Sequence, residues 1–259
     1  MSSLVELAAE SVGRAAREAL QQGEGEVCAA YRRSFYARFA GERYACVGER
    51  SLGHGPLNAI VASLVLPAVG ERVRIATEHA GLWTAPAFAA AGAPAIEALQ
   101  QAARQNVPQE GLGGLIVGEH NAVAIHAQPA LEALERWLVG HTLERETERL
   151  IGLGPGLTPS GDDYLGGMLL ALRTCGREAQ AQALWRWLEP RLAGRTSAIS
   201  AAHLAAAAQG EAHEALHECL RKLYGSERSW EDVLRALSAV GHCSGWDGLA
   251  GAHAVLRLG

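Results

Sequence analysis

The sequence predicts an α+β protein in which a β-rich N-terminal half, a sheet or small barrel, packs against an all-helical C-terminal half. Between residues 27 and 125, short runs of β-branched and aromatic residues are separated by Gly, Pro or Asn, which is typical of strands and turns. From residue 129 onward, apolar residues recur at helical spacing and several stretches end at Gly, as helices commonly do. The change occurs at "HAQPA", so we expect domains at 1–128 and 129–259.

Individual elements follow from the same patterns. Residues 3 to 22 carry apolar residues at helical spacing and predict an N-terminal helix that "QGEGE" ends, because Gly is unfavourable in helix interiors. The segments after it predict strands, and "VGEHNAVAI" predicts a hairpin. Residues 87–104 form an exception and predict a helix after Pro94. The predicted strand segments are "VCAAYRRSFYARFAG", "RYACVGE", "NAIVASLVL", "RVRIATEHAGLWT", "GGLIVGEH" and "NAVAIHA".

Composition excludes several functional classes. The 259 residues carry a formal net charge of -5 without a basic block, which argues against nucleic acid or an anionic membrane as a partner. Five cysteines at scattered spacings, without a CxxC motif, argue against a zinc site and a disulfide framework and fit a reducing cytoplasm. No apolar run approaches the length of a membrane span, and the N-terminus lacks the apolar core of a signal peptide.

Two segments of the predicted helical half repeat one pattern. "SGDDYLGG" (160–167) and "SGWDGLAG" (244–251) both follow S-G-x-D-x-L-x-G, and each stands where a helical pattern begins. One interpretation is a pair of capping boxes, in which Ser160 and Ser244 cap their helices and Asp163 and Asp247 reach back. Such a cap contributes about 1 kcal/mol to stability.

The alternative interpretation is a ligand site built on converging helix starts. Gly161 and Gly245 would let a ligand approach the first turn of each helix, and "GRTSAISAAHL" supplies a third hydroxyl-rich helix start. Converging N-termini offer backbone N–H groups that bind phosphate or carboxylate. The aspartates would oppose a bare anion unless they bind a divalent cation such as Mg²⁺, receive hydrogen bonds from an amide or ammonium, or cap helices.

The residues assigned to this site fall into two groups. Asp162, Asp163, Asp247 and His242 are the predicted catalytic residues, and the three aspartates are also the predicted metal ligands. The predicted ligand-binding residues are Gly154, Gly156, Leu157, Thr158, Ser160, Gly161, Thr196, Ser197, Ser200, Ser244 and Gly245, together with His54 and Asn58 of the loop "SLGHGPLNAIV". His54 is otherwise an exposed turn residue, and the "HEALH" pair His213 and His217 predicts a solvated helix face.

Other nucleotide and nucleophile motifs are absent from the sequence. The loop at 152–160 lacks the Lys of a P-loop. It also differs from a dinucleotide-binding loop, because it does not follow a predicted strand and it contains Pro155. Neither a G-x-S-x-G motif nor a Cys–His pairing indicates a covalent nucleophile.

Three segments carry a family resemblance. "GLGPGLTPSGDDYLGGMLLAL", "TSAISAAHLAAAAQGE" and "GHCSGWDGLAG" resemble the AllH family, long catalogued as a domain of unknown function, with "LGHGPLNAIV" as its N-terminal part. The named member of that family is one subunit of a three-component oxamate carbamoyltransferase of purine (allantoin) degradation. The sequence departs from the family pattern at Cys243, where a second Ser is expected.

The resemblance implies carbamoyl transfer between oxalurate and phosphate, which gives oxamate and carbamoyl phosphate, and it implies partner subunits. In our hypothesis the helix starts at Ser160 and Ser244 hold the anionic end of the ligand. The aspartates take its amide end or Mg²⁺, and His242 moves a proton or stabilises developing charge. Two alternatives are a non-catalytic assembly or binding subunit and a stand-alone metal-dependent hydrolase that uses the aspartates.

Overall fold

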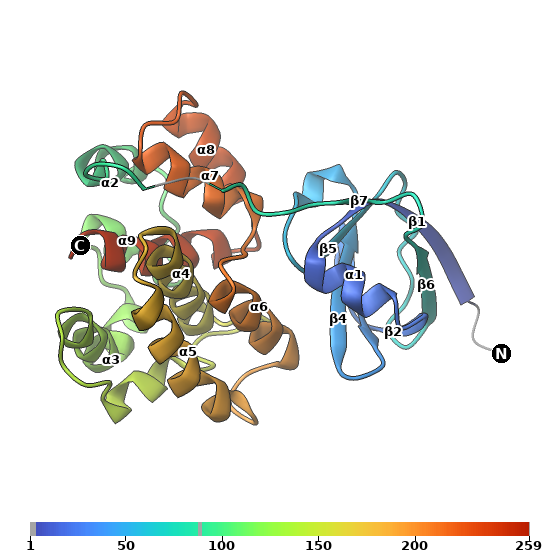
Figure 1. Cartoon of the computed structure of the whole chain (residues 1–259), viewed down its shortest axis with the longest axis horizontal. Coiled ribbons are helices and arrows are strands. Elements are labelled where there is room, and N and C mark those ends of the chain that lie inside the picture. The colour runs from blue at the N-terminus through green and yellow to red at the C-terminus, as the bar shows by residue number, and fades with distance from the viewer. Residues whose placement is uncertain (1–3, 88–89, 259) are drawn as a thin grey trace. The chain divides into compact units, whose positions relative to one another are not determined.

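The structure is a computed structural model that describes residues 4–87 and 90–258 (Figure 1). It consists of two compact units, Met1–Pro86 and Ala87–Gly259. The first is rich in strands and the second is helical, so the α+β class is confirmed. Residues 87–128, which the sequence analysis assigned to the N-terminal domain, lie in the second unit.

The first unit is a small barrel. Its strand order is β5-β4-β3-β2-β6-β1-β7, and β5 also pairs with β1, which closes the first six of these strands on themselves. The β1–β6, β1–β7 and β4–β5 pairs are parallel, and the other pairs are antiparallel. The elements are β1 (Leu4–Val12), α1 (Arg14–Leu20), β2 (Glu24–Ala30), β3 (Ser34–Phe39), β4 (Arg43–Gly48), the 3-10 turn η1 (Arg50–Leu52), β5 (Asn58–Val61), β6 (Arg72–Ala76) and β7 (Gly81–Leu82).

Period-two alternation fills the interior of this barrel. In β3, Phe35, Ala37 and Phe39 are buried, and in β6 Val73 and Ile75 are buried between exposed neighbours. Successive side chains of a strand point to opposite faces, so each strand supplies one apolar row to the core. The strands predicted between residues 27 and 82 are confirmed in this unit.

The predicted N-terminal helix over residues 3–22 is wrong over most of its length. Residues Leu4–Val12 form β1, and only Arg14–Leu20 is helical. Strand β1 pairs with β5, β6 and β7, and these long-range partners override the local helical spacing. Gly13 separates the two elements, and a Cβ there would stand 2.0 Å from the carbonyl oxygen of Gly55.

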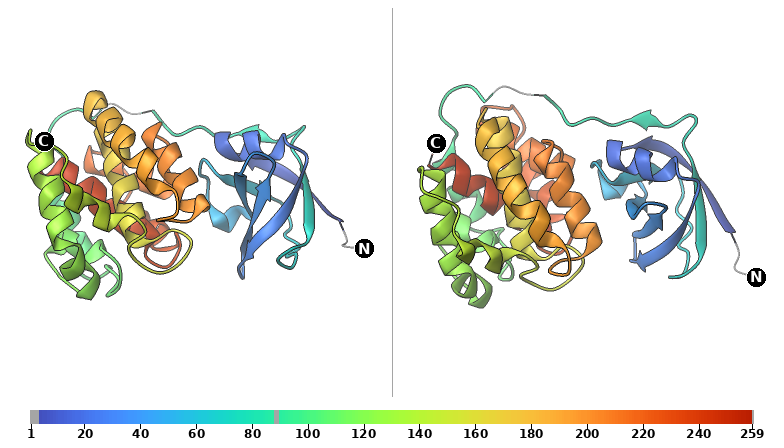
Figure 2. Two further views of the ribbon diagram at one scale, coloured as in Figure 1. Left: turned by 90° about the horizontal axis from the view of Figure 1, so that it is seen from below. Right: turned by 60° about the horizontal axis from the view of Figure 1, so that its bottom comes forward.

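The second unit is a bundle of helices. They are α2 (Ile96–Ala103), η2 (Gly113–Val117), α3 (Ala122–Leu138), η3 (Arg145–Leu150), α4 (Ser160–Thr174), α5 (Glu178–Leu192), α6 (Ala198–Ala208), α7 (Glu214–Leu223), α8 (Trp230–Ser238) and α9 (Ser244–Leu256), where η2 and η3 are 3-10 helices. Helices α4 and α9 lie side by side in its interior (Figures 1 and 2), and most of their residues are buried. Among the described residues, no helix combines the length and the apolar character that crossing a membrane requires.

Glycines allow α4 and α9 to touch through their backbones. A Cβ on Gly167 would stand 1.8 Å from the carbonyl oxygen of Gly248, and a Cβ on Gly251 would stand 1.9 Å from that of Tyr164. Gly167 and Gly251 occupy the same position in the two S-G-x-D-x-L-x-G segments, as do Tyr164 and Gly248. The contact is therefore reciprocal, and the last glycine of each repeat is required by helix packing.

The hairpin predicted at "VGEHNAVAI" is wrong. Residues Gly113–Val117 form η2, and α3 begins after Asn121, whose side chain accepts a hydrogen bond from the Ala124 N–H at 3.0 Å. Pro129 lies inside α3. Proline inside a helix costs about 3 kcal/mol, and burial of α3 residues on both sides of Pro129 offsets that cost. The helix predicted after Pro94 is confirmed as α2.

Candidate binding site at the starts of α4 and α9

The two S-G-x-D segments meet at the starts of α4 and α9. The hydroxyl oxygens of Thr158, just before α4, and Ser244, the first residue of α9, lie 3.0 Å apart. The Asp163 carboxyl group accepts a hydrogen bond from Ser244, and the Asp247 carboxyl group accepts one from Ser160. Each repeat thus directs its aspartate toward the serine of the other repeat, and the polar side chains gather between the two helix starts.

The predicted capping boxes are not formed. The residues at the cap positions are Pro159 and Cys243, neither of which makes a side-chain capping bond. Ser160 and Ser244 are the first helical residues instead. The interhelical role of these side chains explains the difference, because a serine that faces the other helix cannot also reach its own third amide.

Asp163 carries the feature of this site that most needs an explanation. Its Oδ2 atom is buried and has no hydrogen-bond partner within the described structure. Burial raises the pKa of Asp163 well above its ordinary value, and the charges of Asp247 and Asp162 raise it further. Hydrogen bonds to Ser244 and Thr158 act in the opposite direction. The carboxyl therefore keeps its proton to a higher pH than an exposed aspartate does.

Asp247 is more fully engaged. It is buried, and its Oδ1 accepts a hydrogen bond from the N–H of Leu112 at the start of η2. Burial raises the pKa of Asp247 to about 6, although hydrogen bonds from Leu112, Ser160 and Gly113 hold it lower than burial alone would. Asp247 thus secures the loop before η2 against α9.

Asp162 holds the third predicted helix start in place. Its Oδ1 accepts from the Gly152 N–H at 2.9 Å, and its Oδ2 accepts from the hydroxyls of Thr196 and Ser200, the latter at 2.7 Å. Ser197 caps α6 and also donates to the Leu157 carbonyl oxygen. The hydroxyl-rich segment therefore does reach the start of α4, where the hydrogen bonds already occupy both oxygens of Asp162.

Gly161 and Gly245 are packing residues. A Cβ on Gly161 would stand 2.0 Å from the Leu150 carbonyl oxygen, and a Cβ on Gly245 would stand 2.4 Å from that of Leu237. Their N–H groups donate to the carbonyls of Leu153 and Val240. Protein backbone thus occupies the space and the amides that the sequence analysis assigned to an anion at these two positions. The polar groups that remain in the site are mainly carboxyl groups.

The loop before α4 depends on two glycines with positive φ. Gly154 has a φ of 112°, and a Cβ there would approach the Ser160 nitrogen to 3.0 Å. Gly156 has a φ of 93° and is exposed. L-residues rarely adopt these angles, so both positions favour glycine for conformational reasons. Leu157 and Thr158 are partly buried in the same loop.

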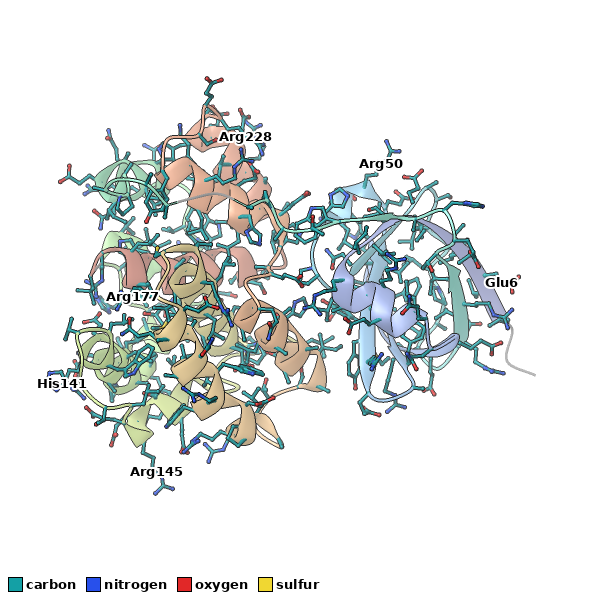
Figure 3. All side chains as sticks on the ribbon, in the orientation of Figure 1. Glu6, Arg50, His141, Arg145, Arg177 and Arg228 are labelled. Carbon is teal, nitrogen blue, oxygen red and sulfur yellow. The ribbon has the colours of Figure 1, made fainter. Side chains whose placement is uncertain are left out.

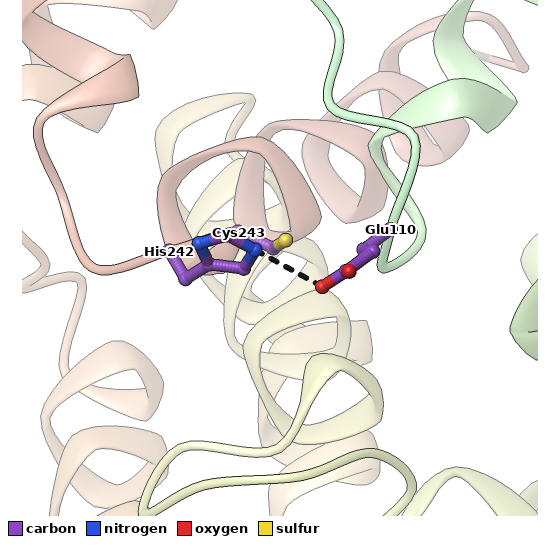
Figure 4. Close-up of side chains that lie close together, drawn as sticks. All are labelled: Glu110, His242 and Cys243. Atoms are coloured by element: carbon purple, nitrogen blue, oxygen red, sulfur yellow. Dashed lines mark hydrogen bonds and ion pairs between the residues drawn. The ribbon is translucent and has the colours of Figure 1, made fainter.

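His242 lies beside Glu110 and Cys243 in this region (Figure 4). Its Nε2 is 3.0 Å from Glu110 Oε2, and both side chains are largely exposed. The buried thiol of Cys243 lies beside them. The sequence analysis missed Glu110 and assigned no role to Cys243, because the contact joins residues 132 positions apart and follows no spacing rule.

His54 and Asn58 belong to the first unit. The Asn58 side chain is buried and donates to the Gly53 carbonyl oxygen at 2.9 Å, which closes the loop between them. The His54 ring is stacked on Trp83, with 6.1 Å between ring centroids. These contacts give both residues structural roles within the barrel unit, and their assignment to ligand binding stays a prediction.

The solvated helix face predicted at "HEALH" is wrong. His217 is buried, and its Nε2 accepts a hydrogen bond from the Ala212 N–H at 3.1 Å. Burial lowers the pKa of His217 to about 4, with a further contribution from His213. His213 caps α7 through Nδ1, which accepts from the Ala215 N–H.

Comparison with known proteins gives a match to the segment that contains α4 and α9. No solved structure matches the chain. The family model AllH, described as oxamate carbamoyltransferase subunit AllH, matches residues 150–256, which span α4 to α9 and both S-G-x-D repeats. The resemblance found in the sequence is confirmed over this segment, which is similar to the oxamate carbamoyltransferase subunit family AllH.

Proposed function

We propose that the chain is a subunit of an oxamate carbamoyltransferase-like enzyme and that the starts of α4 and α9 bind its carbamoyl-bearing substrate. The reaction would transfer a carbamoyl group between oxalurate and phosphate, giving oxamate and carbamoyl phosphate. The family match supports the enzyme class. The observation that carries the binding proposal is the buried Oδ2 of Asp163, which has no partner within the described structure.

A neutral carboxyl group suits a primary amide. Its O–H donates to the amide carbonyl, and its carbonyl oxygen accepts from the NH₂ group, so the pair forms two parallel hydrogen bonds. The raised pKa of Asp163 keeps the group protonated into a higher pH range than usual. A neutral Asp163 also does not repel the carboxylate of oxamate or oxalurate, which removes the conflict between anionic ligands and an acidic site.

The other side chains receive supporting roles in this proposal. Ser244 and Thr158 orient Asp163 through hydrogen bonds, and Asp247, whose pKa is about 6, can exchange a proton near neutral pH. His242 stands at the exposed edge, where it can stabilise the anionic end of a ligand when it is protonated. Asp162 is a positioning residue, because its oxygens hold Gly152, Thr196 and Ser200.

This assignment favours carbamoyl recognition over a hydrolase with a three-aspartate metal site. Hydrogen bonds from protein donors occupy both oxygens of Asp162 and one oxygen of Asp247. Within residues 4–87 and 90–258, the group that gathers three potential metal ligands is Glu110, His242 and Cys243. The Mg²⁺ that the sequence analysis considered at the aspartates therefore forms no part of the proposal.

Calorimetric titration of the purified chain with oxamate tests the binding proposal. We expect oxamate to bind and oxalate, which lacks the NH₂ group, to bind at least about tenfold more weakly, since losing a buried hydrogen-bonding group costs roughly 1–3 kcal/mol. Asp163→Leu should abolish oxamate binding. Asp163→Asn should retain binding, because an amide also forms the paired hydrogen bonds, but its affinity should no longer fall as the pH rises.

Asp232→Asn is the matched control, because Asp232 also follows a serine by three residues in the first turn of a helix, but is exposed. It should bind oxamate as the unaltered chain does. Circular dichroism establishes that each variant is folded. Equal oxamate affinity in Asp163→Leu and the unaltered chain would overturn the proposal, as would equal affinity for oxamate and oxalate.

Catalysis in this proposal depends on partner subunits of the same enzyme, in the cytoplasm, where the five free thiols stay reduced. The description of the family as a subunit supports partners. Co-expression with the other subunits of an oxamate carbamoyltransferase should yield a complex that forms carbamoyl phosphate from oxalurate and phosphate. A chain that forms no complex would leave the assembly part of the proposal wrong.

A further inference from the structure

Three metal-binding side chains of different kinds gather beside the start of α9. They are the carboxylate of Glu110, the imidazole of His242 and the thiol of Cys243, and their ligand atoms all lie within 4.8 Å of one another (Figure 4). His242 and Glu110 form a hydrogen-bonded pair at 3.0 Å. That pair accounts for two of the three groups, but it does not account for a thiol at the same place.

The backbone around Glu110 is fixed from two sides. The Asn121 side chain donates to the carbonyl oxygens of Gln109 and Gly111, at 2.9 and 2.8 Å. The Leu112 N–H donates to buried Asp247, which belongs to α9. These bonds hold the Glu110 loop at a set position relative to the residues that begin α9. Support of this kind around potential ligands is what orients metal sites in proteins.

His242 and Cys243 are held by the helix that follows them. Cys243 occupies the cap position of α9, and its carbonyl oxygen accepts from the Asp247 N–H at 2.9 Å. Gly241, with a φ of 60°, makes the turn before them. The thiol is buried, whereas the His242 and Glu110 side chains are open to solvent, so a small ion can reach the group from outside.

The donor set selects a class of cation. Sulfur and imidazole nitrogen suit Zn²⁺ and similar transition metals, whereas Mg²⁺ and Ca²⁺ require oxygen ligands. Burial, together with the negative charges of Asp247 and Glu110, raises the pKa of the Cys243 thiol to about 11. The same negative surroundings favour a cation at this place.

We propose that Glu110, His242 and Cys243 form a binding site for one divalent cation of the zinc class. On binding, the thiol of Cys243 loses its proton to solvent and the thiolate sulfur becomes a ligand, with the imidazole nitrogen and one carboxylate oxygen as the second and third. The inference can be tested apart from the proposed carbamoyl chemistry, because the ligands exclude Asp163; the two proposals share His242, which the metal would hold in its neutral form.

Titration with Co²⁺, which replaces Zn²⁺ and is coloured, tests this site directly. The whole chain is first stripped of metal with a chelator. We expect one Co²⁺ per chain and a thiolate-to-Co²⁺ charge-transfer band, both removed by one equivalent of Zn²⁺ and unaffected by excess Mg²⁺. Cys243→Ser should abolish the band, and His242→Ala or Glu110→Gln should weaken Co²⁺ binding by at least about tenfold.

Matched controls come from exposed residues elsewhere. Cys28→Ser removes an exposed thiol, and His141→Ala removes an exposed imidazole on the surface of the helical unit (Figure 3). Both should bind Co²⁺ as the unaltered chain does. Asp163→Leu should also keep the charge-transfer band even where it abolishes oxamate binding, so that the two proposals fail separately.

Two outcomes would overturn the metal site. The first is the absence of stoichiometric Co²⁺ or Zn²⁺ binding by the unaltered chain. The second is a charge-transfer band that survives in Cys243→Ser or disappears in Cys28→Ser, because the thiolate ligand would then be a different cysteine.

Discussion

At the beginnings of α8 and α4, a serine is followed three residues later by an aspartate, yet the two pairs act differently. At α8, Ser229 accepts from the Asp232 N–H at 3.1 Å, and its hydroxyl donates to the Asp232 carboxylate at 2.7 Å. Ser229 therefore acts as an ordinary N-cap, on an exposed turn of the helix. At α4, Ser160 is already inside the helix and Asp163 faces α9.

The residue after the serine accounts for the difference. Trp230 follows the serine at α8, whereas Gly161 and Gly245 follow it at α4 and α9. Each of these glycines lies against a backbone carbonyl of the segment that precedes its helix. The close contact starts the helix one residue earlier and turns the serine toward the other helix. Glycine between Ser and Asp therefore indicates buried, paired helix starts, and a bulky residue indicates an ordinary cap.

The largest expected effect concerns the glycines that let α4 and α9 touch. Gly167→Ala or Gly251→Ala places a methyl group within 1.9 Å of a backbone carbonyl oxygen, which only separation of the two helices can relieve. We expect a loss of more than about 4 kcal/mol in the free energy of unfolding, or failure to fold. Denaturant titration followed by tryptophan fluorescence measures it, since five of the six tryptophans lie in the helical unit.

Gly166→Ala is the control for that prediction, because it changes the neighbouring residue of the same helix. A Cβ on Gly166 would lie 3.8 Å from its nearest neighbours, which is ordinary contact. The variant should be as stable as the unaltered chain or more stable by up to about 1 kcal/mol, since alanine favours helices over glycine. Equal stability of the Gly166 and Gly167 variants would remove the packing explanation.

The second expected effect concerns the free energy of unfolding, whose dependence on pH should have opposite signs for Asp163 and Asp232. Asp163 has a raised pKa, so the folded state binds its proton more tightly than the unfolded state. The associated stability is present at low pH and is lost as the pH rises through the raised pKa. Asp163→Asn should therefore gain stability relative to the unaltered chain as pH rises, by at most about 1.4 kcal/mol per pH unit.

Asp232 should behave in the opposite way. The hydroxyl of Ser229 lowers the pKa of Asp232, as do the charges of Arg235 and Arg228. Its stabilising contribution is present above the ordinary pKa of aspartate and is lost as pH falls through the lowered value. Asp232→Asn should cost a little stability at neutral pH and nothing in strong acid. Unfolding curves of both variants between about pH 2 and pH 8 would contradict the comparison if their slopes had the same sign.

Much of the site could be predicted because its signals are local. The S-G-x-D repeat and the hydroxyl-rich segment 196–200 can be read from the sequence, and the structure does bring them together. The roles of the individual residues could not be predicted from the sequence in the same way. Whether Gly161 admits a ligand or a backbone carbonyl depends on Leu150, and whether Asp162 is available depends on Thr196 and Ser200. Contacts of this kind are set by packing and leave no spacing pattern.

The same difference between local patterns and long-range contacts applies to the fold. Strands with alternating burial, such as β3 and β6, were predictable because the period of two is local. Strand β1 was mistaken for helix because its partners, β5 and β6, lie about 50 to 70 residues away. Glu110 was missed for a related reason, since its loop is held by Asn121 and by Asp247 through Leu112.

The smallest expected effect is a difference in pH dependence between the stability costs of replacing Ser229 and Ser244. Ser229→Ala removes the cap of α8 and should cost about 1 kcal/mol of stability, with little change in that cost between pH 6 and pH 8, because Asp232 stays ionised throughout. Ser244→Ala removes no cap, but it removes a hydroxyl that lowers the pKa of Asp163. Its cost should therefore grow as pH rises and ionises Asp163. Thermal melting at several pH values measures both, and a cost for Ser244→Ala that is equally independent of pH would make it an ordinary cap after all.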